Sequence, residues 1–260
     1  MSDLVLDVQG IGKQYNRAVS LQPEYRTLKE TIEHTVKGWM GKSTGIDAKQ
    51  EKFWALQDIT FQLRRGEVLG IIGRNGSGKT TLLKIITRLT HPTTGNLTVH
   101  GSIGSYLGIG VGLHQELSGR ENIFVSGTML GMTKKEIDRK LEEIIAFAEL
   151  EEFIDMPMKY YSSGMQSRLA FSVAAHLEER DILIIDEALA AGDLAFIQKC
   201  FRKIGEMVKK GQTAIYTSHY PDQITMLSTR CLYLQQGKVV EEGNPHALTQ
   251  RYLRDIGIKK

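Results

Sequence analysis

One eight-residue run, Gly73 to Thr80, constrains the fold of this chain more than any other feature. Its sequence, Gly-Arg-Asn-Gly-Ser-Gly-Lys-Thr, satisfies every fixed position of the pattern G-x-x-x-x-G-K-[ST]. The apolar stretch Val68 to Ile72 precedes it, and apolar residues at helical spacing follow it. This order predicts a buried strand, a glycine-rich loop and a helix, an arrangement that surrounds phosphate with backbone N–H groups and the positive end of a helix dipole.

The residue types in this run predict a nucleoside triphosphate site that also holds Mg²⁺. Lys79 can reach the terminal phosphates, and the Thr80 hydroxyl can bind the metal ion. We expect the nucleotide to contact the whole loop and the residue after it: Gly73, Arg74, Asn75, Gly76, Ser77, Gly78, Lys79, Thr80 and Thr81. The alternative is a glycine-rich turn with a lysine present by chance, and it leaves the flanking strand and helix unexplained.

The composition is that of an ordinary globular protein. With 260 residues, 41% of them hydrophobic, the chain can form one large domain or two small ones. Its 33 basic and 30 acidic residues leave a net charge of +3, which gives no electrostatic reason to expect nucleic acid as a partner. The sequence shows neither a membrane span nor a signal-peptide pattern. Cys200 and Cys231 have no metal-ligand spacing, so we expect both to be buried apolar residues.

The hydrophobic pattern predicts an α/β fold with a parallel sheet. Two stretches near the N-terminus alternate in polarity and indicate antiparallel strands with one buried face: Leu4 to Val8 and Ile59 to Leu63. Three short apolar runs indicate strands buried on both faces: Glu67 to Ile72, Ile182 to Ile185 and Ala214 to Ser218. A helical pattern over 194 to 209 separates the last two, in the βαβ order of a parallel sheet.

A block of helices is expected over residues 120–178. Thr133 and Glu136 have the spacing of a capping box, and the residues after them give a helix with one apolar face. Short strands are expected at 96–100 and 238–241, and Asn244 before Pro245 predicts the start of a last helix. We therefore interpret residues 1–260 as a single nucleotide-binding domain with an N-terminal antiparallel β subdomain and an α-helical subdomain.

Two carboxylates follow the strand Ile182 to Ile185. Asp186 and Glu187 therefore lie at the carboxyl edge of the predicted sheet, where ligands of α/β proteins bind. Asp186 can hold Mg²⁺, and Glu187 can orient the attacking water or accept its proton. Alone, the pair is also compatible with two solvated residues at a strand end. The phosphate loop earlier in the chain favours the catalytic reading.

Between the two motifs, the run Tyr161-Ser-Ser-Gly-Met165 precedes an apolar helix. Here the chain resembles the ATP-binding cassette (ABC) family of transporters, whose Leu-Ser-Gly-Gly-Gln signature it matches at Ser162 and Gly164. It departs from the common form at Tyr161, Ser163 and Met165. The resemblance implies that Ser162, Ser163 and Gly164 complete the ATP site of the opposite subunit. A Ser-Ser-Gly turn at a helix start is a suitable anion site, although taken by itself it is equally a helix cap.

Other residues extend the resemblance over most of the chain. The run Ala188 to Asp193 is similar to the family loop that contacts the partner subunit. His219 is similar to the switch histidine that contacts the γ-phosphate, and Tyr15 to the aromatic residue that stacks on adenine. From the residues alone, His219 could instead be a capped loop residue and Tyr15 part of the core.

One family feature is missing. The family usually has a glutamine that touches Mg²⁺ and reports the nucleotide state to the membrane partner, and by spacing its place falls near Gly108; Gln115 comes too late. The glycines 108, 110 and 112 suggest a dinucleotide fingerprint at first, but no strand and helix flank them. We interpret this segment as a hinge.

Several segments together resemble the ATPase subunits of bacterial polysaccharide exporters, those for O-antigen, capsule or teichoic acid. These are the glycine-rich segment, the Tyr-Ser-Ser-Gly-Met signature and the loop Asp186 to Asp193. An insert over 16–55 contains apolar residues at helical spacing between Tyr25 and Trp39, which predicts an amphipathic helix. Its apolar stripe could pack on its own domain or contact a transmembrane partner or lipid headgroups. The residues after 241 are too few for the C-terminal carbohydrate-binding domain of some relatives.

The resemblance implies an ATPase that works as a homodimer with two copies of a membrane permease. ATP and Mg²⁺ are the implied cofactors, a lipid-linked polysaccharide is the implied cargo, and no nucleic acid is involved. The subunit is expected at the cytoplasmic face of the inner membrane, as a peripheral protein. The alternatives are a soluble cassette ATPase without a transport role, an ABC ATPase that exports another substrate, and a regulatory nucleotide switch without turnover. Glu187 disfavours the nucleotide switch because it supplies a hydrolytic group.

Overall fold

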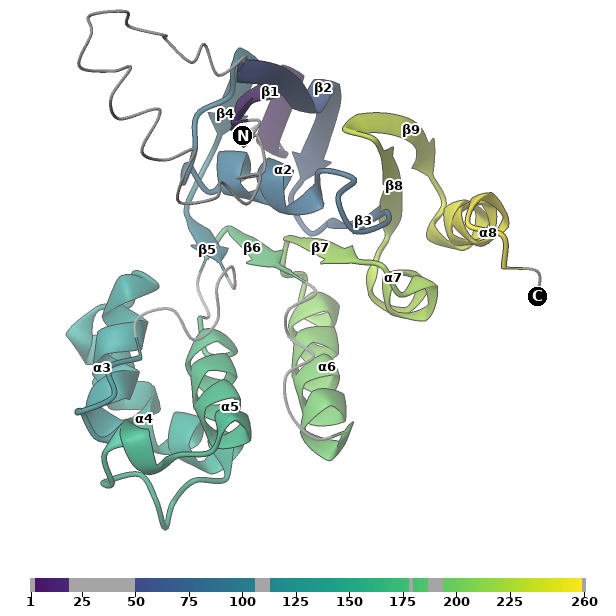
Figure 1. Ribbon diagram of the computed structural model, residues 1–260. Coiled ribbons are helices and arrows are strands. Elements are labelled where there is room, and N and C mark those ends of the chain that lie inside the picture. Colours follow the sequence, from purple (N-terminus) through teal and green to yellow (C-terminus); the bar gives the residue numbers. More distant parts are fainter. Residues whose placement is uncertain (1–2, 19–49, 106–112, 178–179, 187–193, 259–260) are drawn as a thin grey trace, which may run out of the picture.

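The computed structural model describes residues 3–18, 50–105, 113–177, 180–186 and 194–258, and these residues contain two sheets (Figure 1). The smaller sheet is antiparallel with strand order β2-β1-β4: β2 Gln50–Arg64, β1 Leu4–Ala18 and β4 Thr94–Val99. The larger sheet has the order β5-β6-β7-β3-β8-β9: Ile103–Ser105, Ile182–Ile185, Ala214–Ser218, Val68–Ile72, Arg230–Gln235 and Lys238–Gly243. Its strands pair in parallel except for β9, which runs antiparallel at the edge.

The central strands are apolar throughout because both faces of the larger sheet are covered. Along β3, Leu69 and Ile71 pack against α2 (Lys79–Ile86) and the antiparallel sheet, whereas Val68 and Ile72 belong to the core on the opposite face. That second face is covered by α6 (Leu194–Lys209), α7 (Pro221–Leu227) and α8 (Pro245–Asp255). The predicted α/β fold with a parallel sheet is confirmed, and strands β6 and β7 have the bounds expected from the sequence.

The helical block forms a separate layer beside the sheet (Figure 1). It contains α3 (Gly119–Met129), α4 (Lys134–Ala148), the short 3-10 helix η1 (Met158–Tyr160) and α5 (Ser163–Ala174), which share a hydrophobic core of their own. The capping box at Thr133 and Glu136 is present at the start of α4. Asn244 caps α8, as expected, by accepting hydrogen bonds from two backbone N–H groups. Within the described residues, no helix is both long enough and apolar enough to cross a bilayer.

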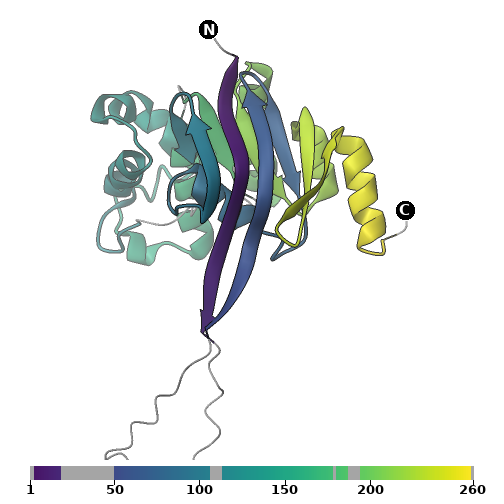
Figure 2. The same ribbon diagram turned by 90° about the horizontal axis from the view of Figure 1, so that it is seen from above.

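The two strands that enclose the predicted insert are longer than expected. β1 and β2 run as a paired ribbon beyond the rest of the sheet, with Tyr15 opposite Phe53 and Ala18 opposite Gln50 (Figure 2). Residues at both ends of the 16–55 segment are therefore strand, because cross-strand hydrogen bonding continues past the alternating pattern that the sequence shows. The helix expected between Tyr25 and Trp39 lies outside the described residues.

Both cysteines are buried, as expected, and burial raises the pKa of each thiol to about 12. A thiol with so high a pKa remains protonated at neutral pH and is a poor nucleophile or metal ligand. Cys200 and Cys231 thus serve as small apolar residues of the core.

Asp181 holds the amino end of β6 to its neighbours. Its carboxylate accepts hydrogen bonds from the Ser102 backbone N–H at 2.8 Å and from Arg65 at 3.1 Å, and these contacts, the Ser102 N–H first, lower its pKa. Because the folded-state pKa lies below the unfolded value, the stabilisation is complete above about pH 4 and is lost as pH falls through the folded pKa. We expect Asp181→Asn to reduce the free energy of unfolding by about 1 kcal/mol at pH 7. In urea titrations this difference should shrink below pH 4; a constant difference at all pH values would contradict the assignment.

Candidate nucleotide-binding site

The register of the parallel sheet brings three motif positions to one edge. Ile72 lies opposite Ser218 on β7, and Ile185 of β6 lies opposite Tyr216. The glycine-rich loop, Asp186 and His219 each follow one of these strands directly, so all three begin at the carboxyl ends of neighbouring strands. Sequence reasoning placed Asp186 at the carboxyl edge of the sheet, and the strand order β6-β7-β3 brings the loop and His219 to the same edge.

Backbone geometry explains the glycines of the loop. Gly78 is the N-cap of α2 and has φ of 109°, a conformation that residues with a Cβ rarely adopt. A Cβ there would lie 2.7 Å from Leu56 Cδ2 and 2.8 Å from the Ala55 backbone oxygen. The close approach of β2 therefore leaves no room for a side chain at this position of the loop. Without side chains, the backbone N–H groups of the loop can lie close to a bound phosphate.

Two polar side chains of the loop are buried and directed within it. The Lys79 ammonium donates a hydrogen bond to the Gly73 carbonyl oxygen at 2.7 Å. The Ser77 hydroxyl is buried and makes no hydrogen bond among the described residues. An orphaned buried hydroxyl costs free energy, and a phosphate oxygen would satisfy it. The loop thus has the donors of an anion site, with a lysine that can exchange its carbonyl partner for phosphate.

A pocket opens beside the loop, and its wall contains more residues than the sequence indicated. It is lined by Tyr15, Phe53, Trp54, Ala55, Asn75, Gly76, Ser77, Gly78, Lys79, Thr80, Thr81, Gln236 and Gly237. The rings of Tyr15 and Phe53 stack with centroids 5.9 Å apart, and the Lys13 ammonium lies 5.1 Å from the Tyr15 centroid. Phe53 is 47% exposed and Trp54 40% exposed. Such exposed aromatic rings offer a planar apolar surface suited to a nucleobase.

Sequence reasoning found Tyr15 but missed five of these lining residues. Phe53 and Trp54 form an aromatic pair opposite Tyr15 and Gln14 in the β1–β2 ladder, and a cross-strand search could have found them. Gln236 and Gly237 form the turn between β8 and β9, and both have positive φ. The Gly237 N–H donates to the Ser77 carbonyl oxygen at 2.9 Å, so this distant turn supports the phosphate loop. No sequence signal links positions so far apart.

Asp186 lies at the end of β6 and is buried. It accepts a hydrogen bond of 2.6 Å from the Thr217 hydroxyl on β7, which orients the carboxylate at the edge of the sheet. The Thr80 hydroxyl and the Asp186 carboxylate are hard oxygen donors, and both follow strands that share this edge. This donor chemistry fits Mg²⁺. Glu187 and the loop to Asp193 lie outside the described residues, as do Gly108, Gly110 and Gly112.

His219 follows β7 and is partly buried. Its ring packs on that of Tyr220, with centroids 4.0 Å apart, and Tyr220 is half-exposed. In the sheet, β7 lies between β3, which leads into the glycine-rich loop, and β6, which leads into Asp186. A residue directly after β7 therefore lies between these two parts of the site, where a terminal phosphate would be expected.

The signature residues lie in the helical block, away from this pocket. Ser162 is the N-cap of α5, and its hydroxyl accepts a hydrogen bond from the Met165 N–H. Ser162 and Ser163 are exposed, and neither they nor Gly164 line the pocket beside the loop. The 12-residue helix α5 is about 18 Å long and precedes β6 in the chain, and Ser162 lies at the end of α5 that is farther from β6 in sequence. One copy of the chain does not bring the signature to its own phosphate loop.

The departures from the common signature have a structural cause. Tyr161 is buried in the helical core, and its hydroxyl donates to the Phe153 carbonyl oxygen at 2.7 Å. Met165 packs against the same core. Tyr161 and Met165 thus pack into the helical core at the start of α5, whereas the third departure, Ser163, is exposed beside Ser162.

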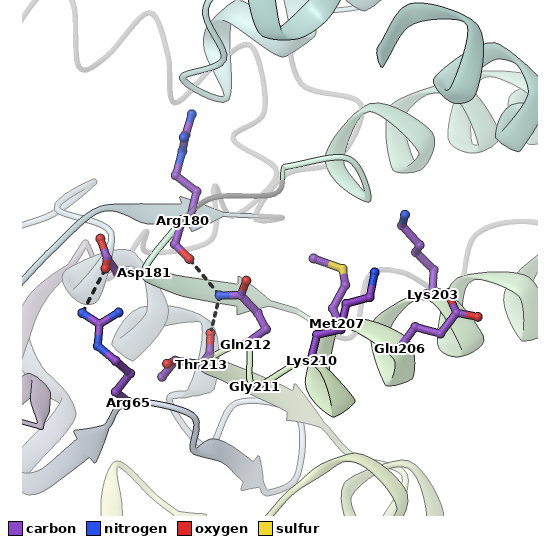
Figure 3. Close-up of a pocket in the computed structure, with 10 residues that line it drawn as sticks. All are labelled: Arg65, Arg180, Asp181, Lys203, Glu206, Met207, Lys210, Gly211, Gln212 and Thr213. Carbon is purple, nitrogen blue, oxygen red and sulfur yellow. Dashed lines mark hydrogen bonds and ion pairs between the residues drawn. The ribbon is translucent and has the colours of Figure 1, made fainter. Parts of the chain in front are cut away.

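A second pocket lies at the opposite edge of the sheet (Figure 3). It is lined by Asp181 and Thr213, which precede β6 and β7, and by residues near the end of α6. Because these positions are at the amino ends of the strands, the pocket is separated from the glycine-rich loop by the length of the sheet. Its charges are mixed, and the Arg65 guanidinium pairs with Asp181. It is therefore no part of the candidate site.

Comparison with known proteins places the site in context. Residues 56–190 match the family model described as "ABC transporter". The chain is 40% identical to "ABC transporter protein AbcA" of Aeromonas salmonicida, over 97% of this chain and 77% of that protein. It is 43% identical to "O-antigen export system ATP-binding protein RfbB" of Klebsiella pneumoniae over 78% and 82% of the two chains. It is also 43% identical to "Teichoic acids export ATP-binding protein TagH" of Levilactobacillus brevis over 79% and 56%.

Solved structures share the fold. A dimeric post-hydrolysis state of the ATP-binding cassette MJ0796, bound to ADP and Pi, superposes with a TM-score of 0.69 over 92% of this chain and 98% of that one. The sequence identity is 21%, so this likeness concerns the fold alone. The expected combination of a parallel-sheet core, an antiparallel β subdomain and a helical subdomain is confirmed.

Proposed function

This chain belongs to the ABC transporter family, and we propose that it is the ATP-hydrolysing subunit of a transporter that exports a cell-surface polysaccharide. The observation that carries the ATPase function is the meeting of the glycine-rich loop, Asp186 and His219 at one sheet edge beside an aromatic-lined pocket. The names of relatives more than 40% identical, for O-antigen and for teichoic acid export, support the class of cargo.

We assign the nucleotide to the pocket beside the loop. The N–H groups from Gly73 to Thr81 surround the phosphates, and the buried Lys79 ammonium turns to the terminal phosphates. The Ser77 hydroxyl finds its missing partner there. Tyr15 stacks on the adenine, with Phe53 and Trp54 extending the apolar wall.

The hydrolytic step uses residues at the carboxyl ends of β6 and β7. Glu187 orients the attacking water and accepts its proton, while Lys79 and His219 stabilise the charge that develops on the γ-phosphate. Thr80 and Asp186 would hold Mg²⁺, which when bound neutralises phosphate charge. Thr217 keeps the Asp186 carboxylate oriented through its 2.6 Å hydrogen bond.

A complete site requires two copies of the chain. Ser162 and Ser163 are exposed at the start of α5, and neither they nor Gly164 line the pocket of their own chain, so a second copy would present these residues to the γ-phosphate. The helix N-terminus and the Ser162 hydroxyl are suitable donors for an anion. ATP then joins the two subunits, and hydrolysis separates them.

A substitution that blocks hydrolysis tests this two-copy site. We expect Glu187→Gln to reduce the ATPase rate at least tenfold while ATP and Mg²⁺ convert the protein to a stable dimer. Sedimentation velocity with and without ATP measures the dimer. A variant that stays monomeric and hydrolyses ATP at the wild-type rate would exclude the two-copy site.

Ser162→Ala should weaken ATP-dependent dimerisation. The change removes an N-cap, which costs about 1 kcal/mol of stability, and also the hydroxyl that meets the partner's ATP. Thr133→Ala is the matched control, because it removes the N-cap of α4 at a similar cost and lies in no proposed contact. We expect about a tenfold loss of ATPase activity for Ser162→Ala alone. Equal activities of the two variants would show that the serine acts only as a cap.

The transport role is tested by the partner. We propose that the dimer works with two copies of a permease at the cytoplasmic face of the inner membrane, handles a lipid-linked polysaccharide, and binds no nucleic acid. Affinity purification from solubilised membranes should recover a permease. Loss of surface polysaccharide in cells that carry only Glu187→Gln would support the cargo class. Recovery of the chain without any membrane protein would favour the second candidate, a cassette ATPase without a transport role.

A further inference from the structure

Glu149 ends helix α4 in a conformation that glutamate rarely adopts. It has φ of 57° and ψ of 48°, in the left-handed region where helix ends favour glycine. Its carboxylate also lies at the negative end of the α4 dipole, and the last turn of α4 contains no basic residue. Local physics therefore disfavours glutamate at this position for two independent reasons. Such local conflicts are most often found at functional positions.

The carboxylate of Glu149 is held by cations from two other helices. Arg168 of α5 donates to one of its oxygens at 2.8 Å, and the Lys199 ammonium of α6 donates to the other at 2.7 Å. Lys199 also donates to the Phe147 carbonyl oxygen at 3.0 Å, and so satisfies the end of α4 from outside the helix. These contacts, the hydrogen bond from Lys199 first, lower the pKa of Glu149, so it is ionised at neutral pH. One side chain thus joins three helices.

An aromatic cluster contacts both cations. Phe147, Phe171 and Phe196, one from each helix, lie with ring centroids 5.9 to 6.2 Å apart. The Arg168 guanidinium lies 5.1 Å from the Phe196 centroid, and the Lys199 ammonium lies 4.8 Å from that of Phe147. The side chains of the two cations are 23% and 32% exposed and that of Glu149 is 52% exposed, so solvent partly screens the ion pairs, and the ring contacts help to fix the positions of both cations. Ion pairs and ring contacts together therefore restrict the orientation of α5 relative to α6.

The two helices that Glu149 connects begin at two different parts of the proposed ATP machinery. α5 begins at Ser163, directly after its N-cap Ser162. α6 begins at Leu194, eight positions after Asp186 in the sequence. Ser162 lies six positions before Arg168, about 9 Å along the axis of α5, so a rotation of α5 against α6 would move Ser162 relative to the sheet edge.

We propose that Glu149 is a positioning residue that holds the signature helix α5 at a defined angle to α6, so that Ser162 reaches the ATP of the second copy. The inference rests on the two-copy ATP site of the proposed function. Nothing in this role requires Glu149 to touch ATP. Its effect is on the assembly of the shared site and not on the binding of nucleotide to one chain.

Glu149→Gly separates this role from a contribution to stability alone. Glycine relieves the left-handed backbone, which offsets the loss of two partly exposed ion pairs, so we expect the thermal midpoint to stay within about 3 °C of wild type. The affinity of the single chain for a fluorescent ATP analogue should stay within about twofold. In the Glu187→Gln background, ATP-dependent dimerisation should weaken about tenfold, and in the wild-type background kcat should fall by about the same factor.

Three further variants complete the experiment. Asp155→Asn is the matched control, because Asp155 pairs with Arg120 inside the helical block, and it should leave kcat unchanged. Glu149→Gln and Arg168→Gln should each lower kcat, and the double variant should be little worse than Glu149→Gln alone, since that substitution already removes the ion pair with Arg168. Wild-type kcat in Glu149→Gly, or a fall only in proportion to unfolded protein, would overturn the inference. Failure of the Glu187→Gln parent to dimerise with ATP would instead reject the two-copy site itself.

Discussion

Lys79→Met is expected to lower the ATPase rate by a factor on the order of 10² to 10³. The Lys79 ammonium is buried inside the loop, where it donates to the Gly73 carbonyl oxygen, and it has only to exchange this partner for the terminal phosphates. Methionine has a similar length and fills the same space, but it supplies neither the charge nor the donors. A steady-state assay over a range of ATP concentrations measures the loss.

Lys84→Met is the control for this variant. Lys84 lies in the last turn of the same helix and is exposed, so its ammonium is free of any contact with the loop that we assign to phosphate. We expect its kcat to remain within about twofold of wild type. An equal loss in both variants would indicate that positive charge on α2 acts only at long range, and it would contradict the direct role of Lys79.

Asp186→Asn should reduce hydrolysis about 100-fold while leaving the fold intact. The amide oxygen of asparagine can still accept the hydrogen bond from Thr217, so the sheet edge is preserved, but the negative charge that would hold Mg²⁺ is lost. We therefore expect the variant to require a higher Mg²⁺ concentration for half-maximal activity. A titration of activity with MgCl₂ at fixed ATP measures this shift.

Asp181→Asn, at the other end of β6, is the control for Asp186→Asn. Asp181 and Asp186 flank β6, and each accepts hydrogen bonds, but Asp181 lies at the amino edge next to Arg65. Its substitution should lower stability and leave the Mg²⁺ dependence unchanged. If both variants lost activity to the same extent, the effect of Asp186→Asn would be one of stability, and its role in holding metal would be wrong.

Much of the candidate site could be predicted because its motifs are local. The glycine-rich loop, the apolar strand before it, the helix after it and the carboxylates after β6 are encoded in short runs, and each run has one dominant physical interpretation. The N-caps at Ser162, Thr133 and Asn244 were found for the same reason, since a cap depends on residues within one helical turn.

The parts that sequence reasoning missed are those that depend on distant partners. Nothing in the run Leu234 to Gly237 indicates that this turn supports Ser77, which lies about 160 positions earlier in the chain. Phe53 and Trp54 became part of the pocket only through their register with β1. Likewise, the length of β1 and β2 exceeded the alternating pattern because main-chain pairing continues where the side chains no longer alternate.

The sequence by itself determined that this chain has a phosphate loop, a carboxylate-tipped strand and a serine-capped helix, because each is written in contiguous residues. Only the tertiary structure decided that the loop, Asp186 and His219 share one sheet edge, since that follows from the strand order β6-β7-β3. It also decided that Ser162 lies outside the pocket at that edge, and that Glu149, in a left-handed backbone conformation, binds cations of two other helices. These are non-local contacts, and no single run of residues encodes them.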